Sequence, residues 1–141
     1  MLPAETTHPT TAPATATPQA ATTFIVAVRT LCEFIAKAGD LDLRFTPSPS
    51  AQQGREGHAL VAQRRGPQHE AEVSLSGTYR NLHVRGRADG YDSGRNALEE
   101  VKTFRGRVDA IPWNHQELHW AQLKVYGWLM CQARQLPSIT L

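Results

Sequence analysis

Three strand-like runs follow one another in the middle of the chain, and this block most limits what the chain can fold into. The runs lie at about residues 70–76, 79–91 and 97–104, and the second alternates through Leu82, Val84 and Gly86. Gly77 predicts the turn after the first run, and Asp92-Ser-Gly predicts the turn after the second. The second turn is typical of a hairpin, so we expect its two strands to be partners in one sheet.

Helical patterns surround this block. We expect helices over about residues 22–38, 51–65 and 114–134. The third helix carries a buried stripe made of Leu118, Ala121, Val125 and Leu129. Gly39 would end the first helix and Gly66-Pro67 the second, and residues 138–141 resemble the start of a further strand. This order of elements predicts an α/β (α+β) fold, a central mixed sheet flanked by helices.

Length and composition limit the domain organisation. Residues 1–21 are mostly Thr, Ala and Pro, so we expect a disordered tail, and residues 22–141 suffice for one domain with one core. No run reaches the ~18 apolar residues of a membrane span, and no secretory signal opens the chain, which favours a cytoplasmic protein. Cys32 and Cys131 lie far apart and are expected to be buried free thiols, too few for a zinc or iron–sulfur site.

Arginines crowd the middle of the chain although the net charge is only +2. The cluster consists of Arg64, Arg65, Arg80, Arg85, Arg87, Arg95, Arg105 and Arg107. Such a cluster could meet a phosphate backbone. For the arginines alone, a solvated face of a sheet is the plainer interpretation.

Acidic and basic residues at the second and third runs suggest chemistry. Glu100 follows Asp89 by 11 residues, a spacing that suits two hairpin strands. Alternation along the third strand places Glu100 and Lys102 on one face and Glu99 and Val101 on the other. Burying two opposite charges on one face is costly unless they serve a metal ion or one another. An isolated pattern of this kind more often forms a cross-strand ion pair on a solvated face, because short motifs recur by chance.

A divalent cation is the chemical alternative. Mg²⁺ or Mn²⁺ binds hard oxygen ligands, so Asp89, Glu100 and substrate phosphate would suffice, with the Val101 carbonyl as a third protein oxygen. Lys102 would orient or help to deprotonate the attacking water and offset charge on the phosphorane. His58, on the preceding helix, could ligate the metal through a neutral imidazole nitrogen, although a lone histidine is more often at the surface or satisfied within the fold.

Two further polar residues share one face of the long helix. Gln122 and Tyr126 are four residues apart, so their polar ends could reach the active site or a DNA phosphate. By itself, Tyr126 is more often an ordinary aromatic side chain at the edge of a core.

Taken in order, four segments resemble the RecB-like branch of the PD-(D/E)XK nuclease superfamily. That branch has a helix with a histidine, a strand ending in GxxD, a strand with (D/E)xK and a helix with QxxxY. The matching segments are Gly57-His58, Gly86-Arg-Ala-Asp89, Glu100-Val-Lys102 and Gln122-Leu-Lys-Val-Tyr126. The resemblance covers about residues 50–135, and four ordered matches are much more specific than any one.

The resemblance implies a restriction-endonuclease-like core that acts on DNA. It implies that His58, Asp89 and Glu100 bind the metal and that Lys102 assists catalysis. Supporting or DNA-contacting roles would fall to Gln122, Tyr126, Arg87 and Arg105.

A second resemblance concerns the protein context. Residues 26–45 with GRADGYD, LEEVKTFRG and HWAQLKVYGWL are similar to the N-terminal nuclease-like region of certain bacterial DinG-type DNA helicases. This similarity implies a helicase motor as a partner in cis or in trans, although the sequence contains no GxxxxGK[ST] phosphate loop. The family core continues after the long helix, so we expect the C-terminal part of the core to be missing.

The sequence thus predicts Mg²⁺- or Mn²⁺-dependent DNA cleavage, in DNA repair or recombination. Two alternatives remain open. One is a catalytically inactive DNA-binding or docking module with a nuclease fold, and the other is a scaffold unrelated to nucleic acid.

Overall fold

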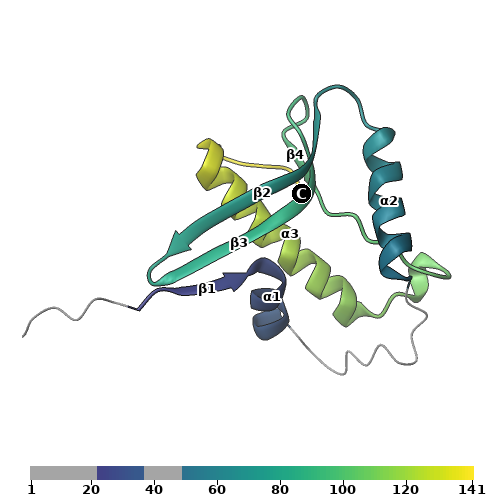
Figure 1. The fold of residues 1–141 in the computed structure, drawn as a ribbon. Helices are drawn as coiled ribbons and strands as arrows, with labels where there is room; N and C mark the ends of the chain where they lie inside the picture. The colour runs from purple at the N-terminus through teal and green to yellow at the C-terminus, as the bar shows by residue number, and fades with distance from the viewer. Residues whose placement is uncertain (1–21, 37–48) are drawn as a thin grey trace, which may run out of the picture.

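A computed structural model describes residues 22–36 and 49–141 (Figure 1). Its elements, in chain order, are β1 (Phe24–Ala27), α1 (Val28–Ala36), α2 (Ala51–Gln63), β2 (His69–Tyr79), β3 (Leu82–Asp92), β4 (Ala97–Glu99), the short 3₁₀ helix η1 (Val108–Ala110) and α3 (Trp113–Arg134). The tail predicted for residues 1–21 and the helix end predicted at Gly39 lie outside the described residues.

The four strands form one mixed sheet with β3 at its centre. β2 pairs antiparallel with β3 along its length, except at Glu72 and Asp89. On the other edge of β3, β1 pairs in parallel as far as Arg85, and β4 pairs antiparallel from Gly90 onward. Residues 86–89 of β3 therefore lie in a gap between two edge strands. The predicted α/β architecture, a mixed sheet with helices against it, is confirmed at this level.

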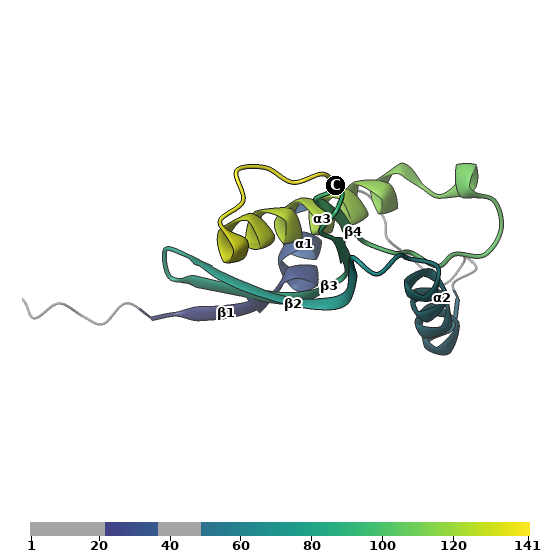
Figure 2. The same ribbon diagram turned by 90° about the horizontal axis from the view of Figure 1, so that it is seen from above.

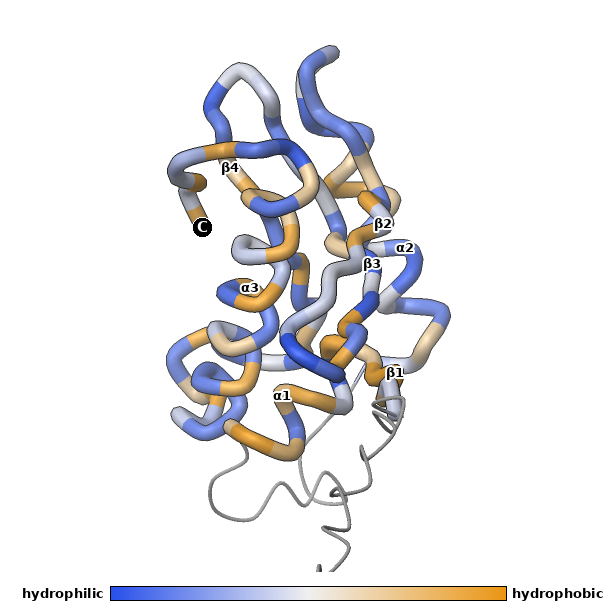
Figure 3. The backbone as a smooth tube through the Cα atoms, turned by 90° about the vertical axis from the view of Figure 1, so that its left-hand side faces the viewer, coloured by the Kyte–Doolittle hydropathy of each residue, from blue (hydrophilic) through white to orange (hydrophobic). Residues whose placement is uncertain are grey.

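Helices α1 and α3 pack on the same face of the sheet, and α2 lies apart, beyond its end (Figure 2). The core between them is made of Val28, Cys32, Val73, Leu75, Val84, Ala88, Tyr91, Leu98, Tyr126, Leu129 and Met130. Hydrophobic and hydrophilic residues are mixed along α3 (Figure 3). Of its predicted stripe only Leu129 is buried, whereas Leu118, Ala121 and Val125 are half-buried against the core. No helix in the described part of the chain combines the length and apolar character needed to cross a membrane.

The first helix begins later than predicted. Residues 24–27 form strand β1, and α1 starts only at Val28. Phe24, Ile25 and Val26 are aromatic or β-branched, a composition that favours an extended backbone where a neighbouring strand is available. That neighbour is β3, which lies more than fifty residues further along the chain.

The turn predicted at Gly77 is also wrong. Gly77 lies inside β2, and the chain turns at Arg80 and Asn81, where Arg80 takes a left-handed φ of 54°. A Cβ atom at Gly77 would lie 2.8 Å from a methyl group of Leu129 on α3. The glycine therefore marks a close approach of helix to strand and not a reversal of the chain.

The third predicted strand is much shorter than 97–104, because β4 ends at Glu99. The backbone N–H of Val101 donates to a side-chain oxygen of Asp89 at 2.7 Å instead of continuing the ladder. The other predictions fare better: α2 and α3 match the expected helices closely, and Asp92 closes the second turn by accepting from two backbone N–H groups. The expected further strand is reduced to a single bridge between Thr140 and Ala97.

Candidate active site

The sheet loses its regular alternation where the predicted site lies. Ala88 and Tyr91 both enter the core, although residues three apart on a regular strand face opposite sides. On the partner strand, Glu72 lies opposite Asp89 but outside the regular pairing and has a φ of 55°. An L-residue in this region is strained, and such strain is concentrated at functional sites. The distortion gives Asp89 surroundings that a regular strand would not.

Asp89 connects three parts of the fold. Its Oδ1 lies 3.2 Å from Nδ1 of His58 on α2, and its Oδ2 accepts the N–H of Val101 beyond β4. Both oxygens of this carboxylate are therefore held in place by elements far apart in sequence. The structure thus brings His58 to Asp89, as the sequence predicted, and Val101 contributes its N–H group.

Glu100 lies beside this carboxylate. The β3–β4 register pairs Gly90 with Glu99, and one further step places Glu100 next to Asp89. Its side chain is only 10% exposed, and its Oε1 accepts from Lys102 Nζ at 2.6 Å. Glu100 and Lys102 therefore lie together as predicted, although they follow the strand and are not part of it.

The second oxygen of Glu100 is the unusual group of the site. Oε2 is buried and has no hydrogen-bond partner. Burial raises the pKa of Glu100, the Lys102 ammonium opposes that rise, and the charge of Asp89 adds to it. A buried, unpartnered carboxylate oxygen is costly, so this atom is suited to a cation that the protein does not itself supply.

The protein donors alone do not form a complete metal cage. Within residues 22–36 and 49–141, no three His, Cys, Asp or Glu side chains gather closely enough to hold a metal ion. Two neighbouring carboxylates are nevertheless the donors that Mg²⁺ commonly uses, since it keeps several waters and binds substrate phosphate as well. The arrangement fits such an ion, and Glu100 Oε2 is the atom with a free position.

Gln122 and Tyr126 lie beneath the site and not on the surface. Both are buried, and a Cβ atom at Gly86 would lie 2.8 Å from the hydroxyl oxygen of Tyr126. Burial raises the pKa of Tyr126, and the charge of Glu100 contributes to the same effect. Gln122 Oε1 is a second buried oxygen without a partner. Of the two roles predicted for this pair, the geometry favours support of the site.

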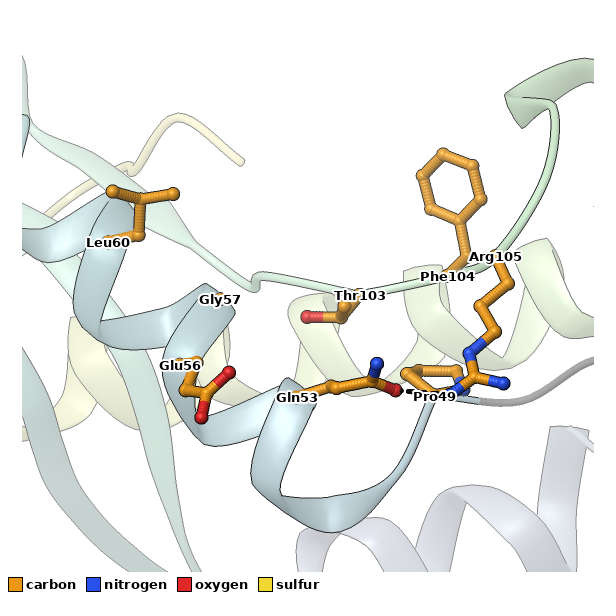
Figure 4. A pocket seen from close by; sticks show the side chains of 8 residues that line it. All are labelled: Pro49, Gln53, Glu56, Gly57, Leu60, Thr103, Phe104 and Arg105. Carbon is orange, nitrogen blue, oxygen red and sulfur yellow. Dashed lines mark hydrogen bonds between the residues drawn. The ribbon is translucent and has the colours of Figure 1, made fainter.

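The segment after Glu100 runs between α2 and the first half of α3 (Figures 1 and 2). Thr103 approaches α2 so closely that a Cβ atom at Gly57 would lie 2.5 Å from its Oγ1. Gln53, Thr103 and Arg105 line a pocket between this segment and α2. Figure 4 shows the Arg105 side chain extending toward Gln53, to which it donates at 2.6 Å. Arg105, predicted to bind DNA, thus takes part in fastening this segment to α2.

Two hollows adjoin the site. A cleft of about 640 Å³ is lined by Asp89, His58 and Glu72 together with Arg55 and Arg87. Arg87, predicted to contact DNA, therefore lies at the mouth of the site. Arg87 lies on β3, two residues before Asp89, which accounts for its place beside this cleft.

The second hollow, of about 330 Å³, lies against α3. Glu100 and Lys102 line it beside Trp120 and His119. Burial, followed by the charge of Lys102, lowers the pKa of His119 to about 4, so its imidazole is neutral at pH 7. Sequence reasoning missed His119, yet it precedes Gln122 by three residues, a spacing that would have placed both on one helix face.

Arg55 was also missed, and the same spacing relates it to His58 on α2. Glu99, by contrast, belongs elsewhere. It pairs with Arg65 at 2.9 Å and lies near His69 and Arg95, so the two adjacent glutamates serve different clusters.

Comparison of the chain with family models, curated proteins and solved structures finds no match.

Proposed function

We propose that residues 22–141 form a Mg²⁺- or Mn²⁺-dependent deoxyribonuclease domain of the PD-(D/E)XK type, hydrolysing phosphodiester bonds. One observation carries the proposal: Glu100 presents a buried, unpartnered oxygen beside Asp89 while Lys102 holds its other oxygen. A bound divalent ion at such a site lowers the pKa of a coordinated water and polarises the phosphate. DNA repair or recombination, next to a helicase motor in cis or in trans, is the proposed setting.

The residues divide the work by position. Asp89 and Glu100 would hold the ion, and His58 together with the Val101 N–H keeps the Asp89 carboxylate in one orientation. Fixing the orientation of a ligand in this way raises its affinity for a metal. Lys102, which contacts Glu100, would offset negative charge on a bound phosphate.

Matched substitutions test this assignment. Asp89→Asn and Lys102→Ala should each reduce cleavage of DNA in Mg²⁺ or Mn²⁺ by about 100-fold or more, with an unchanged circular-dichroism spectrum. Asp109→Asn and Lys124→Ala make the same changes of charge at exposed positions and should leave cleavage unchanged. Equal cleavage by all four variants and the wild type would refute the assignment.

Metal binding can be measured without catalysis. Titration of Mn²⁺ followed by electron paramagnetic resonance should show one site that Glu100→Gln weakens by at least about 10-fold. Asp109→Asn again serves as the control. Retention of the site in the Glu100→Gln variant would show that the ion, if bound, does not use the unpartnered oxygen.

The basic β2–β3 hairpin favours a second candidate, a DNA-binding or docking module that does not cleave. It carries Arg80, Arg85 and Arg87 on or beside the face that no helix covers in the described part of the chain. This candidate predicts DNA binding that survives chelation and no cleavage in any divalent metal. The nuclease assay above separates the two.

A further inference from the structure

The β2–β3 hairpin has one face against α1 and α3 and one face turned away from them (Figure 2). The cross-strand register sets out this open face in rows: Ser74 opposite Arg87, and Ser76 opposite Arg85. Each row therefore offers one guanidinium group and one small hydroxyl group. We call these four residues the arginine–serine face.

Positive charge on this face is not balanced by acidic side chains. Residues 73–88, which form most of the hairpin, contain three arginines and no Asp or Glu. Within the described residues Arg85 makes no ion pair, and Arg87 has only a 3.5 Å contact with Glu72 in which both side chains are more than 60% exposed. An ion pair as exposed as this is weak, so both guanidinium groups can accept another anion.

A surface depression connects the arginine–serine face with the candidate active site. A shallow depression of about 490 Å³ is lined by the arginine–serine face, and Arg87 lines both this depression and the cleft over Asp89. Arg85 and Arg87 are two residues apart on one strand, a spacing of about 6.6 Å. That spacing is about the rise of two nucleotides in one strand of a duplex.

We propose that the arginine–serine face binds the sugar–phosphate backbone of a nucleic acid strand and leads it to the Asp89 cleft. Arginine and serine side chains are common partners of phosphate oxygens, and the small serines let a backbone approach the sheet. The path toward the cleft rests on the proposed nuclease function, but the binding itself requires no cleavage. A repeated row of cation and hydroxyl suits a polymer with regularly spaced phosphates better than a single anion.

The test measures binding under conditions that prevent catalysis. The full chain is titrated into fluorescently labelled single- and double-stranded oligonucleotides in EDTA, at several salt concentrations, and anisotropy is recorded. Arg85→Gln and Arg87→Gln should each reduce the slope of log K against log salt by about 0.9 for the duplex, and the double variant by about twice that. Ser74→Ala combined with Ser76→Ala should weaken binding without changing the slope.

Arg29→Gln, on α1 and outside this face, provides the control for loss of one positive charge. An equal reduction of the salt-dependence slope in Arg29→Gln would show that binding depends on net charge and not on the arginine–serine face. That result would overturn the proposal. Binding to vesicles of anionic lipid that competes with DNA and depends on the same arginines would also overturn it.

The proposals can fail separately. Arginine-dependent binding without cleavage in any metal would support the face and refute the nuclease. Cleavage and affinity that persist in the Arg85→Gln/Arg87→Gln variant would support the nuclease and refute the face.

Discussion

Gly86 has a packing role that a single methyl group can test. A Cβ atom at this position would lie 2.8 Å from both Cε1 and Oη of Tyr126, and 3.0 Å from a methyl carbon of Val28. These contacts come from α3 and α1, the two helices that cover the sheet. The substitution Gly86→Ala therefore has no empty space into which the new methyl group can move.

The expected cost follows from two opposing effects. Overpacking of a tight core costs about 1–3 kcal/mol, whereas replacing glycine in a strand recovers about 0.5–1 kcal/mol of backbone entropy. We therefore expect Gly86→Ala to lower the free energy of unfolding by about 1–2 kcal/mol. For a domain of this size that corresponds to a fall in Tm of about 4–8 °C.

Tyr126→Phe identifies the partner. It removes the hydroxyl oxygen that meets the new methyl group, so Gly86→Ala should cost less in the Tyr126→Phe background, by about 0.5–1 kcal/mol. The four proteins of this double-mutant cycle are compared by urea unfolding. Gly54→Ala is the control, because a Cβ atom there meets nothing within 4 Å and should stabilise α2.

Two outcomes would refute the reasoning. An unchanged or higher Tm for Gly86→Ala would mean that the helices are not in close contact with this part of β3. Fully additive free energies would mean that the hydroxyl group of Tyr126 is not what the methyl group meets.

Two further predictions concern stability. Burial raises the pKa of Glu100 in the folded protein above its value in the unfolded chain. Protonated Glu100 therefore stabilises the fold at acid pH, and this stabilisation is lost as pH rises through the raised pKa. Glu100→Gln should therefore raise Tm more at pH 8 than at pH 4 in EDTA, and the reverse order would contradict the assigned shift. Leu129 is fully buried on α3, so Leu129→Ala should lower the free energy of unfolding, measured in urea, by about 3–5 kcal/mol. Leu60 is exposed, and Leu60→Ala should lower it much less. A loss below about 1 kcal/mol for Leu129→Ala would mean that α3 is not the main cover of the sheet.

Local patterns predicted the elements whose causes are local. The α2 and α3 helices follow from periodicity, and α2 has a capping box in which Ser50 and Gln53 satisfy each other's backbone N–H groups. Strand β1 escaped prediction because its four residues become a strand only through β3, a partner far along the chain. Gly77 was misread as a turn for a similar reason, since Leu129 explains it and comes from another element.

The same division holds for the candidate site. The motifs pointed to His58, Asp89, Glu100 and Lys102, and Glu100 and Lys102 do lie together, although the strand whose alternation predicted this ends at Glu99. They did not show that Val101 would give its N–H to Asp89 and so end the strand. The contacts of Asp89 with His58 and Val101 depend on how α2 and the end of β4 meet. A sequence motif alone therefore could not predict that Glu100 Oε2 would have no partner.

Glycine in two of the motifs has a physical explanation in these contacts. Gly57, next to His58, admits the hydroxyl of Thr103, and Gly86, three residues before Asp89, admits the ring of Tyr126. Each glycine thus allows a segment from a distant part of the chain to approach, and at Gly86 that approach brings Tyr126 of one motif to another motif. These two motifs contain glycine because another segment of the chain packs directly against the backbone at that position.

Strand β3 changes its phase of alternation at Asp89. Up to Ala88 the core face of β3 follows strict alternation, and beyond it Tyr91 fills the core from the opposite phase. A change of phase needs a partner strand that is distorted at the same level, and Glu72, with its left-handed backbone, provides it. Because the alternation changes at Asp89, its carboxylate need not point to the covered face of the sheet or to the open face. It can therefore face the cleft under α2 while Glu100 approaches it from the side of α3, an arrangement that no regular hairpin would allow.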